Sequence, residues 1–108
     1  METVKAILGK LTLAEKVSLL VGHDFWHTNA IKRLGLPPIV VSDGPFGLRK
    51  VENQGSGPLE TSRPATAFPT SSALASSFND DLLSEIGHAL ALECIDQGVD
   101  VLLGPGLN

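Results

Sequence analysis

The chain has 108 residues, with 8 Lys and Arg against 12 Asp and Glu and a formal net charge of −4. Hydrophobic residues make up 43% and charged residues 19%, which excludes an intrinsically disordered chain. The acidic balance argues against a nucleic-acid partner, and no apolar run is long enough to cross a membrane. The single cysteine excludes an internal disulfide. Because the charged N-terminus has no signal-peptide core, a cytoplasmic location is expected.

Apolar residues recur at helical spacing over residues 4–20, where Gly9 weakens a continuous helix. Thr12 and Glu15 form a capping-box sequence, in which each side chain binds the backbone amide of the other residue. This pattern predicts a second short helix over residues 13–20. It indicates where a helix begins and says nothing about function.

A short β-branched run follows an irregular stretch over residues 23–38. The run, residues 39–41, predicts a buried strand that ends sharply before residue 42. The next segment, residues 44–72, is rich in Gly and Pro and predicts a long loop, in which residues 67–69 could form a brief strand. Loops of this length often carry function.

The last part of the chain predicts a helix and a second strand. Asn79 is a suitable N-cap for a helix over residues 80–97, and Gly98 stands where a helix-ending glycine is expected. The apolar face of this helix is formed by Leu83, Ile86, Leu90 and Cys94. A second strand covers residues 99–103. The order strand, loop, helix, strand predicts an α/β fold with parallel strands and a right-handed crossover.

Asp43 is the sharpest candidate for a binding residue. It comes directly after the first predicted strand, where α/β proteins bind ligands, and an ionised carboxylate can accept hydrogen bonds from sugar hydroxyls. The alternative is an Asx-type turn, in which Asp43 binds its own backbone. Arg49 either forms an ion pair that orients Asp43 or is a solvated loop residue.

An aromatic and polar cluster covers residues 23–27 (HDFWH). Trp26 could provide a stacking face for a sugar, or the cluster could fill a packing contact. His23 and His27 have the spacing of two metal ligands on a helix, but no helix is predicted there and no third ligand is evident. No metal and no other cofactor is therefore expected.

Short blocks follow one another in order along the chain. They are residues 11–17 (LTLAEKV), 24–28 (DFWHT), 33–37 (RLGLP), 41–49 (VSDGPFGLR), 67–69 (AFP), 73–78 (ALASSF) and 98–108 (GVDVLLGPGLN). Together they resemble the start of glycoside hydrolase family 3, in its β-glucosidase branch. The resemblance implies an α/β fold that is the N-terminal portion of a (β/α)₈ TIM barrel, with about two to three of its βα units. Residues 1–108 would then be the N-terminal part of the barrel domain, with a loop-rich segment at residues 44–72.

The resemblance also implies an activity, the retaining hydrolysis of terminal non-reducing β-D-glucosyl residues, with a β-glucoside or oligosaccharide as substrate. Asp43 matches the family's aspartate that binds sugar hydroxyls, and Arg49 matches a neighbouring arginine. The family's nucleophile and acid/base match no position in this chain, so no catalytic residue is assigned. Retaining hydrolysis needs two carboxyl groups about 5–5.5 Å apart.

The chain alone is therefore expected to be an inactive fragment that requires the remainder of the barrel and the later domains as partners. Two other functions stay open. One is a non-catalytic sugar-binding or regulatory module, indicated by Asp43 and the region around Trp26. The other is an α/β interaction domain whose motif match is coincidental. Neither a nucleic acid nor a membrane is expected as a partner.

Overall fold

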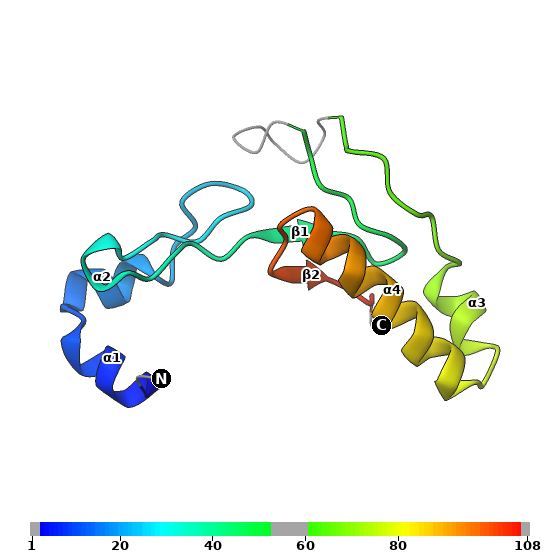
Figure 1. Ribbon diagram of the computed structural model, residues 1–108, viewed down its shortest axis with the longest axis horizontal. Coiled ribbons are helices and arrows are strands. Elements are labelled where there is room, and N and C mark those ends of the chain that lie inside the picture. Colours follow the sequence, from blue (N-terminus) through cyan, green and yellow to red (C-terminus); the bar gives the residue numbers. More distant parts are fainter. Residues whose placement is uncertain (1–2, 53–60, 107–108) are drawn as a thin grey trace.

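The polypeptide forms an arch whose two ends have different architecture (Figure 1). The computed structural model describes residues 3–52 and 61–106. One end carries two short helices, and the other carries a two-stranded parallel sheet with two further helices. The radius of gyration is 16.7 Å, whereas a compact chain of this length has a radius of about 13 Å. The arch is therefore more extended than a self-contained domain of equal length.

Helices α1 (Val4–Lys10) and α2 (Leu13–Ser18) form the N-terminal end. The predicted capping box is confirmed. The Glu15 amide donates to the Thr12 hydroxyl at 3.2 Å, and the Thr12 amide donates to the Glu15 carboxylate at 2.8 Å. The same carboxylate forms an ion pair with Arg33, with 2.7 Å between the Nη2 and Oε2 atoms. One carboxylate therefore caps α2 and anchors a segment that follows much later in the chain.

The stretch predicted to be irregular, residues 23–38, contains one short 3-10 helix, η1 (Lys32–Leu34). It is also tied to the sheet, because the Val41 amide donates to the Trp26 carbonyl at 2.8 Å. Trp26 itself is buried, with 6% of its surface exposed. The burial favours the packing interpretation of the aromatic cluster over a stacking face for a sugar.

The predicted α/β unit is present at the other end of the arch. Strand β1 (Val41–Asp43) pairs in parallel with β2 (Val101–Leu103), and α4 (Asp80–Asp96) connects them. Both strands begin two residues later than predicted. Val40 lies before β1 because its main chain pairs antiparallel with His27, an interaction that the apolar pattern of residues 39–41 does not reveal.

The ends of α4 follow the local signals in the sequence. The Leu82 amide donates to the Asn79 side chain at 3.0 Å, which confirms the N-cap. At the other end Gly98 adopts a left-handed conformation with φ of 64°, as expected of a helix-ending glycine. These signals involve residues at most four positions apart, so they can be identified without knowledge of the fold.

The connection between β1 and α4 differs from the prediction in two ways. A short helix, α3 (Ser71–Ala75), begins inside the predicted loop over residues 44–72. Residues 67–69 form no strand, although the Phe68 amide donates to the Phe46 carbonyl at 2.7 Å. A single hydrogen bond of this kind does not extend into a ladder. Residues 53–60 of the predicted loop lie outside the described residues.

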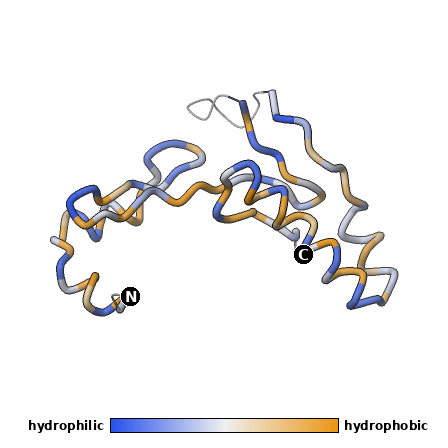
Figure 2. Tube along the Cα trace, viewed as in Figure 1, coloured by the Kyte–Doolittle hydropathy of each residue, from blue (hydrophilic) through white to orange (hydrophobic). Residues whose placement is uncertain are grey.

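The buried core is small. Its apolar members are Leu11, Trp26, Ile31, Leu48, Val51, Cys94 and Val99. Apolar segments are spread along the whole trace in Figure 2 and are not gathered into one centre. The accessible surface is 7639 Å², against about 5,700 Å² for a compact protein of this mass. None of the described helices has the length and hydropathy of a membrane span.

Acidification should release the link between α2 and Arg33. Arg33, and after it the Thr12 amide, lowers the pKa of Glu15 from 4.5 to about 2. Because the folded pKa is depressed, the stabilisation is present above pH 4.5 and is lost as the pH falls through about 2. An NMR titration of the Glu15 carboxyl should therefore give a midpoint near the lower value. The Thr12 amide shift should lose this titration step in Glu15→Gln, and a midpoint near 4.5 in the parent chain would contradict the interpretation.

Candidate functional site

Asp43 is the last residue of β1, at the carboxyl end of the parallel strand pair. The sequence predicted it just beyond the strand, and the structure places it one position inside. Its main chain lies opposite Leu103 of β2, and the residue is half-buried. The carboxyl ends of parallel strands are where open α/β sheets and barrels bind ligands. The expected location of the carboxylate is thus retained, although the strand boundary is different.

The main chain of Asp43 also pairs with Arg49. The Arg49 amide donates to the Asp43 carbonyl at 2.8 Å, and the two residues form an antiparallel bridge. Directly opposed residues of an antiparallel pair project toward the same face. The bridge therefore brings the two predicted site residues together. No ion pair between their side chains is present among the described residues, and Arg49 is exposed.

The carboxylate of Asp43 accepts no hydrogen bond from residues 3–52 or 61–106, so the Asx-type turn is not formed there. The backbone carbonyl of the same residue accepts from the Ser42 hydroxyl at 3.1 Å. Ser42 is 1% exposed, the most completely buried polar residue of the described chain. The main chain of Asp43 is fixed while its charged group keeps its capacity to accept hydrogen bonds.

A tight turn follows β1 and requires glycine at two positions. A side chain on Gly44 would place its Cβ 2.3 Å from the Gly47 carbonyl oxygen. A side chain on Gly47 would place its Cβ 2.2 Å from the carbonyl oxygen of Thr66, and φ at Gly47 is 143°. Both separations are far shorter than any van der Waals contact. The turn is thus packed backbone to backbone against the segment that precedes α3.

Two side-chain interactions tie the flanks of this turn to the end of α4. The Lys50 ammonium group donates to the carbonyl of Gln97. Burial, and secondarily the nearby charge of Arg63, lowers the pKa of Lys50. The carboxylate of Glu93 accepts from the Thr66 amide at 3.2 Å and from the Thr66 hydroxyl at 2.5 Å. Sequence reasoning missed both interactions, because nothing in the local sequence pairs residues 27 or 47 positions apart.

A second polar cluster caps the loop that contains Trp26. Asp24 accepts from the amides of Trp26 and His27 at 2.7 and 2.9 Å, and His27 Nδ1 lies 2.8 Å from the same carboxylate. Burial opposes ionisation, but these hydrogen bonds outweigh it and lower the pKa of Asp24. His27 is therefore engaged in a loop cap. Within the described part of the chain, no three His, Cys, Asp or Glu side chains are close enough to hold a metal.

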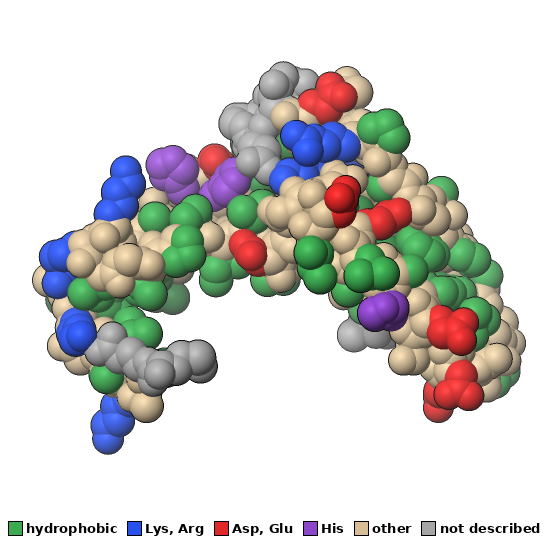
Figure 3. All heavy atoms as spheres, viewed as in Figure 1, with side chains coloured by type: hydrophobic (Ala, Val, Ile, Leu, Met, Phe, Trp, Pro, Cys, Tyr) green, Lys and Arg blue, Asp and Glu red, His purple; other side chains and the backbone are tan. Residues whose placement is uncertain are grey.

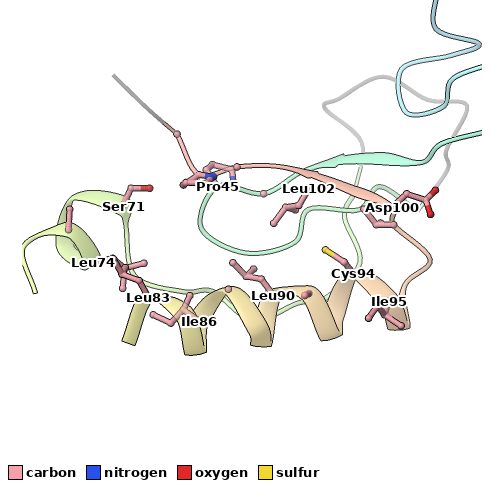
Figure 4. A pocket seen from close by; sticks show the side chains of 18 residues that line it. Pro45, Ser71, Leu74, Leu83, Ile86, Leu90, Cys94, Ile95, Asp100 and Leu102 are labelled. Carbon is pink, nitrogen blue, oxygen red and sulfur yellow. The ribbon is translucent and has the colours of Figure 1, made fainter. Parts of the chain in front are cut away.

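An open groove of about 710 Å³ runs between α4, α3 and the chain that follows the strands (Figure 4). The predicted apolar face of α4 lines one side, and Pro45 and Leu102 lie opposite. In Figure 3, hydrophobic side chains gather over the end of the arch that carries α3 and α4. Asp43 and Arg49 are not among the lining residues. The groove is thus an apolar packing surface, separate from the two predicted site residues.

No protein-family model matches the chain. Among curated proteins, it is 45% identical over 106 residues to a thermostable β-glucosidase B of Acetivibrio thermocellus. It is 46% identical over 100 residues to an exo-α-(1→6)-L-arabinopyranosidase of Bifidobacterium longum. These alignments include 97% and 91% of this chain. The chain spans only 14% and 13% of the length of these two relatives.

Solved structures similar to this chain are also β-glucosidases, and the chain again covers only a small part of each. A β-glucosidase of Kluyveromyces marxianus in complex with glucose matches all of the chain with a TM-score of 0.89 and 41% identity. A family 3 β-glucosidase of Bifidobacterium adolescentis matches 94% of it with a TM-score of 0.80 and 44% identity. The chain corresponds to 12% and 14% of these two structures. The described fold is therefore that of one segment in much larger glycosidases.

Substitution of Gly47 by alanine should destabilise the turn. The new Cβ cannot be accommodated 2.2 Å from the Thr66 carbonyl, and the backbone conformation disfavours any side chain. We expect Gly47→Ala to lower the free energy of unfolding by about 1–3 kcal/mol. The midpoint of urea unfolding measures this change.

The matched control is Gly87→Ala, which introduces the same methyl group in the interior of α4. No atom of another segment lies within 4 Å of the position that this Cβ would take, so the substitution should raise stability by about 1 kcal/mol through helix propensity. The two alanine substitutions should thus change the urea midpoint in opposite directions. Equal shifts of the same sign would contradict the packing of Gly47 on Thr66.

Proposed function

This chain is homologous to β-glucosidases of glycoside hydrolase family 3 over nearly its whole length, and we propose that it forms the sugar-binding beginning of such an enzyme. Asp43 and Arg49 bind the terminal non-reducing sugar of a β-glycoside. The nucleophile and the acid/base of a retaining mechanism come from segments outside residues 1–108. The chain thus contributes substrate binding, and the remaining segments contribute bond cleavage.

The position of Asp43 is the observation that carries this proposal. Its main chain is held by β2 on one side and by Arg49 on the other, while its carboxylate accepts no hydrogen bond within the described residues. An ionised carboxylate can accept from two sugar hydroxyls, and each charge-assisted bond contributes about 1.5–3 kcal/mol. Because the backbone is already ordered, little conformational entropy is lost on binding.

Arg49 complements Asp43 chemically. The guanidinium group only donates hydrogen bonds and the carboxylate only accepts them, whereas a sugar hydroxyl does both. Their main-chain bridge sets both residues on the same face of the turn. A pair of neighbouring hydroxyls on one pyranose ring can therefore bind both side chains. The main-chain bridge supports a proposed binding role for Arg49 beside Asp43.

The sheet is the start of a (β/α)₈ barrel in this proposal. Strands β1 and β2 with the connecting α4 form one βα crossover unit, and the parallel order supports this assignment. Residues 1–108 are then the N-terminal part of the barrel domain, and residues 44–49, which follow β1, lie at the end of the barrel that binds substrate. The remainder of the barrel and the later domains are the partners that complete the site.

A terminal β-D-glucosyl residue is the proposed substrate, because the Acetivibrio thermocellus and Kluyveromyces marxianus relatives bear β-glucosidase names. An α-L-arabinopyranoside is the second candidate, favoured by the 46% identity to the Bifidobacterium longum enzyme. The two sugars share a pyranose ring, and the arabinopyranoside lacks the hydroxymethyl group of glucose. Comparison of the two aryl glycosides distinguishes these substrates.

The test replaces the matching segment of the Kluyveromyces marxianus β-glucosidase with residues 1–108. The resulting chimeric enzyme should hydrolyse an aryl β-glucoside, and the 108-residue chain alone should not. Within the chimera, Asp43→Ala removes up to two hydrogen bonds to the sugar and should lower kcat/KM by about 100- to 1,000-fold. Asp81→Ala, which removes an exposed carboxylate from the first turn of α4, is the matched control and should change kcat/KM less than about twofold.

Two results would overturn the proposal. One is an Asp43→Ala chimera that is as active as its parent. The other is an isolated chain that turns over substrate at a rate well above buffer. A chimera that folds and binds glucose without hydrolysing any glycoside would instead favour the non-catalytic sugar-binding module.

A further inference from the structure

We infer that Glu93, in the last turns of α4, is a positioning residue for the site formed by Asp43 and Arg49. This inference rests on the proposed sugar-binding function. Glu93 reaches the site through Thr66 and the glycine turn that follows β1. It does not itself contact the sugar, so its effect is on the placement of the residues that do.

The first step is the hydrogen bonding between Glu93 and Thr66. The Thr66 amide donates to both carboxylate oxygens of Glu93, to Oε1 at 3.2 Å and to Oε2 at 3.4 Å, and the Thr66 hydroxyl donates to Oε1 at 2.5 Å. Glu93 is half-buried and forms no ion pair with a Lys, Arg or His of the described chain. Its charge is therefore directed at Thr66. Because α4 is a regular 17-residue helix, this attachment point is rigid.

The second step is the contact between Thr66 and the turn. The carbonyl oxygen of Thr66 occupies the space that a side chain on Gly47 would need, since it lies 2.2 Å from the position of such a Cβ. Two residues later the Phe68 amide donates to the Phe46 carbonyl at 2.7 Å. The segment held by Glu93 thus lies directly against the turn. Any displacement of Thr66 changes the space available to Gly47.

The third step is the coupling of the turn to the two binding residues. Gly47 lies between Asp43 and Arg49 in sequence, and the Arg49 amide closes the turn on the Asp43 carbonyl at 2.8 Å. Lys50 independently ties the end of the turn to the Gln97 carbonyl of the same helix. Loss of Glu93 therefore leaves other ties in place, among them the Lys50 bond and the bond between Phe68 and Phe46. The expected result is a displaced turn and not an unfolded one.

A purely structural role for Glu93 would have a different signature. General destabilisation lowers the activity on every substrate by a similar factor. Misplacement of Asp43 lowers the activity most on substrates that offer the hydroxyls bound by Asp43. A series of 2-, 3-, 4- and 6-deoxy aryl β-glucosides identifies one such hydroxyl, because Asp43→Ala changes kcat/KM least on the substrate that lacks it.

The experiment uses the same chimeric enzyme with Glu93→Ala. On the parent aryl β-glucoside we expect kcat/KM to fall about tenfold, because a small displacement of a binding group is enough for a loss of this size. On the deoxy substrate identified above, the loss should be smaller, about threefold, because one of the misplaced contacts is absent. Glu93→Gln retains an oxygen acceptor for both Thr66 donors and should restore activity to within about threefold of the parent.

The matched control is Glu85→Ala, which removes an exposed glutamate from the same helix. This variant should leave kcat/KM unchanged on both substrates. If the Glu93→Ala chimera does not fold, the same measurements are made on Thr66→Val and Thr66→Ser chimeras. The valine variant loses the hydroxyl and should show the same substrate-selective loss, and the serine variant keeps the hydroxyl and should not.

Equal losses on both substrates, or no loss on either, would overturn the positioning role. The outcome is distinguishable from failure of the proposed function. If Asp43→Ala has no effect on any substrate, the sugar-binding function itself is wrong. If Asp43→Ala lowers activity selectively and Glu93→Ala does not, only the role of Glu93 is wrong.

Discussion

The parallel pairing of β1 with β2 is the constraint on which the placement of every proposed site residue depends. The pairing begins just before the strands, where the Asp100 side chain accepts from the Val40 amide at 2.8 Å and the Asp100 amide donates to the Val40 carbonyl at 2.9 Å. This reciprocal exchange sets the register, because a slip by one residue would break both bonds and turn every side chain to the other face. Leu48, Cys94 and Val99 then pack as one buried cluster between the turn, α4 and the start of β2.

The site combines a rigid backbone with an uncommitted side chain. Between Asp43 and Arg49 the conformation is determined by main-chain hydrogen bonds and by glycine contacts that leave no space for a Cβ. None of these interactions uses the Asp43 carboxylate. A side chain that orders its own loop has fewer acceptor sites left for a ligand. Here the glycines and the distant Glu93 order the loop, so the carboxylate can be directed entirely to hydroxyl groups.

Local signals predicted the parts of this structure that local interactions determine. The Thr12 capping box, the Asn79 N-cap and the apolar face of α4 follow from residues a few positions apart, and all three were confirmed. Asp43 was correctly placed at the carboxyl end of the first strand. The strand boundaries and α3 were not predicted, and neither was the attachment of Thr66 to Glu93. The strand boundaries and the Thr66 attachment depend on partners 13 to 60 residues away, such as His27 for Val40 and Asp100 for Val40. Helix α3 has a local N-cap at Thr70, a signal that the sequence analysis overlooked. A periodicity in one segment contains no information on which distant segment lies beside it.

The two halves of α4 have different roles, and the difference explains how an extended segment can carry an ordered site. The C-terminal half contributes Glu93 and the buried Cys94, and the C-cap residue Gln97 contributes its carbonyl. The N-terminal half presents Leu83 and Ile86 to the open groove of about 710 Å³ (Figure 4). Contiguous exposed apolar surface is typical of a face that a ligand or another protein surface contacts. The C-terminal half of α4 therefore holds the segments beside the turn after β1, and the N-terminal half leaves its apolar face in an open groove.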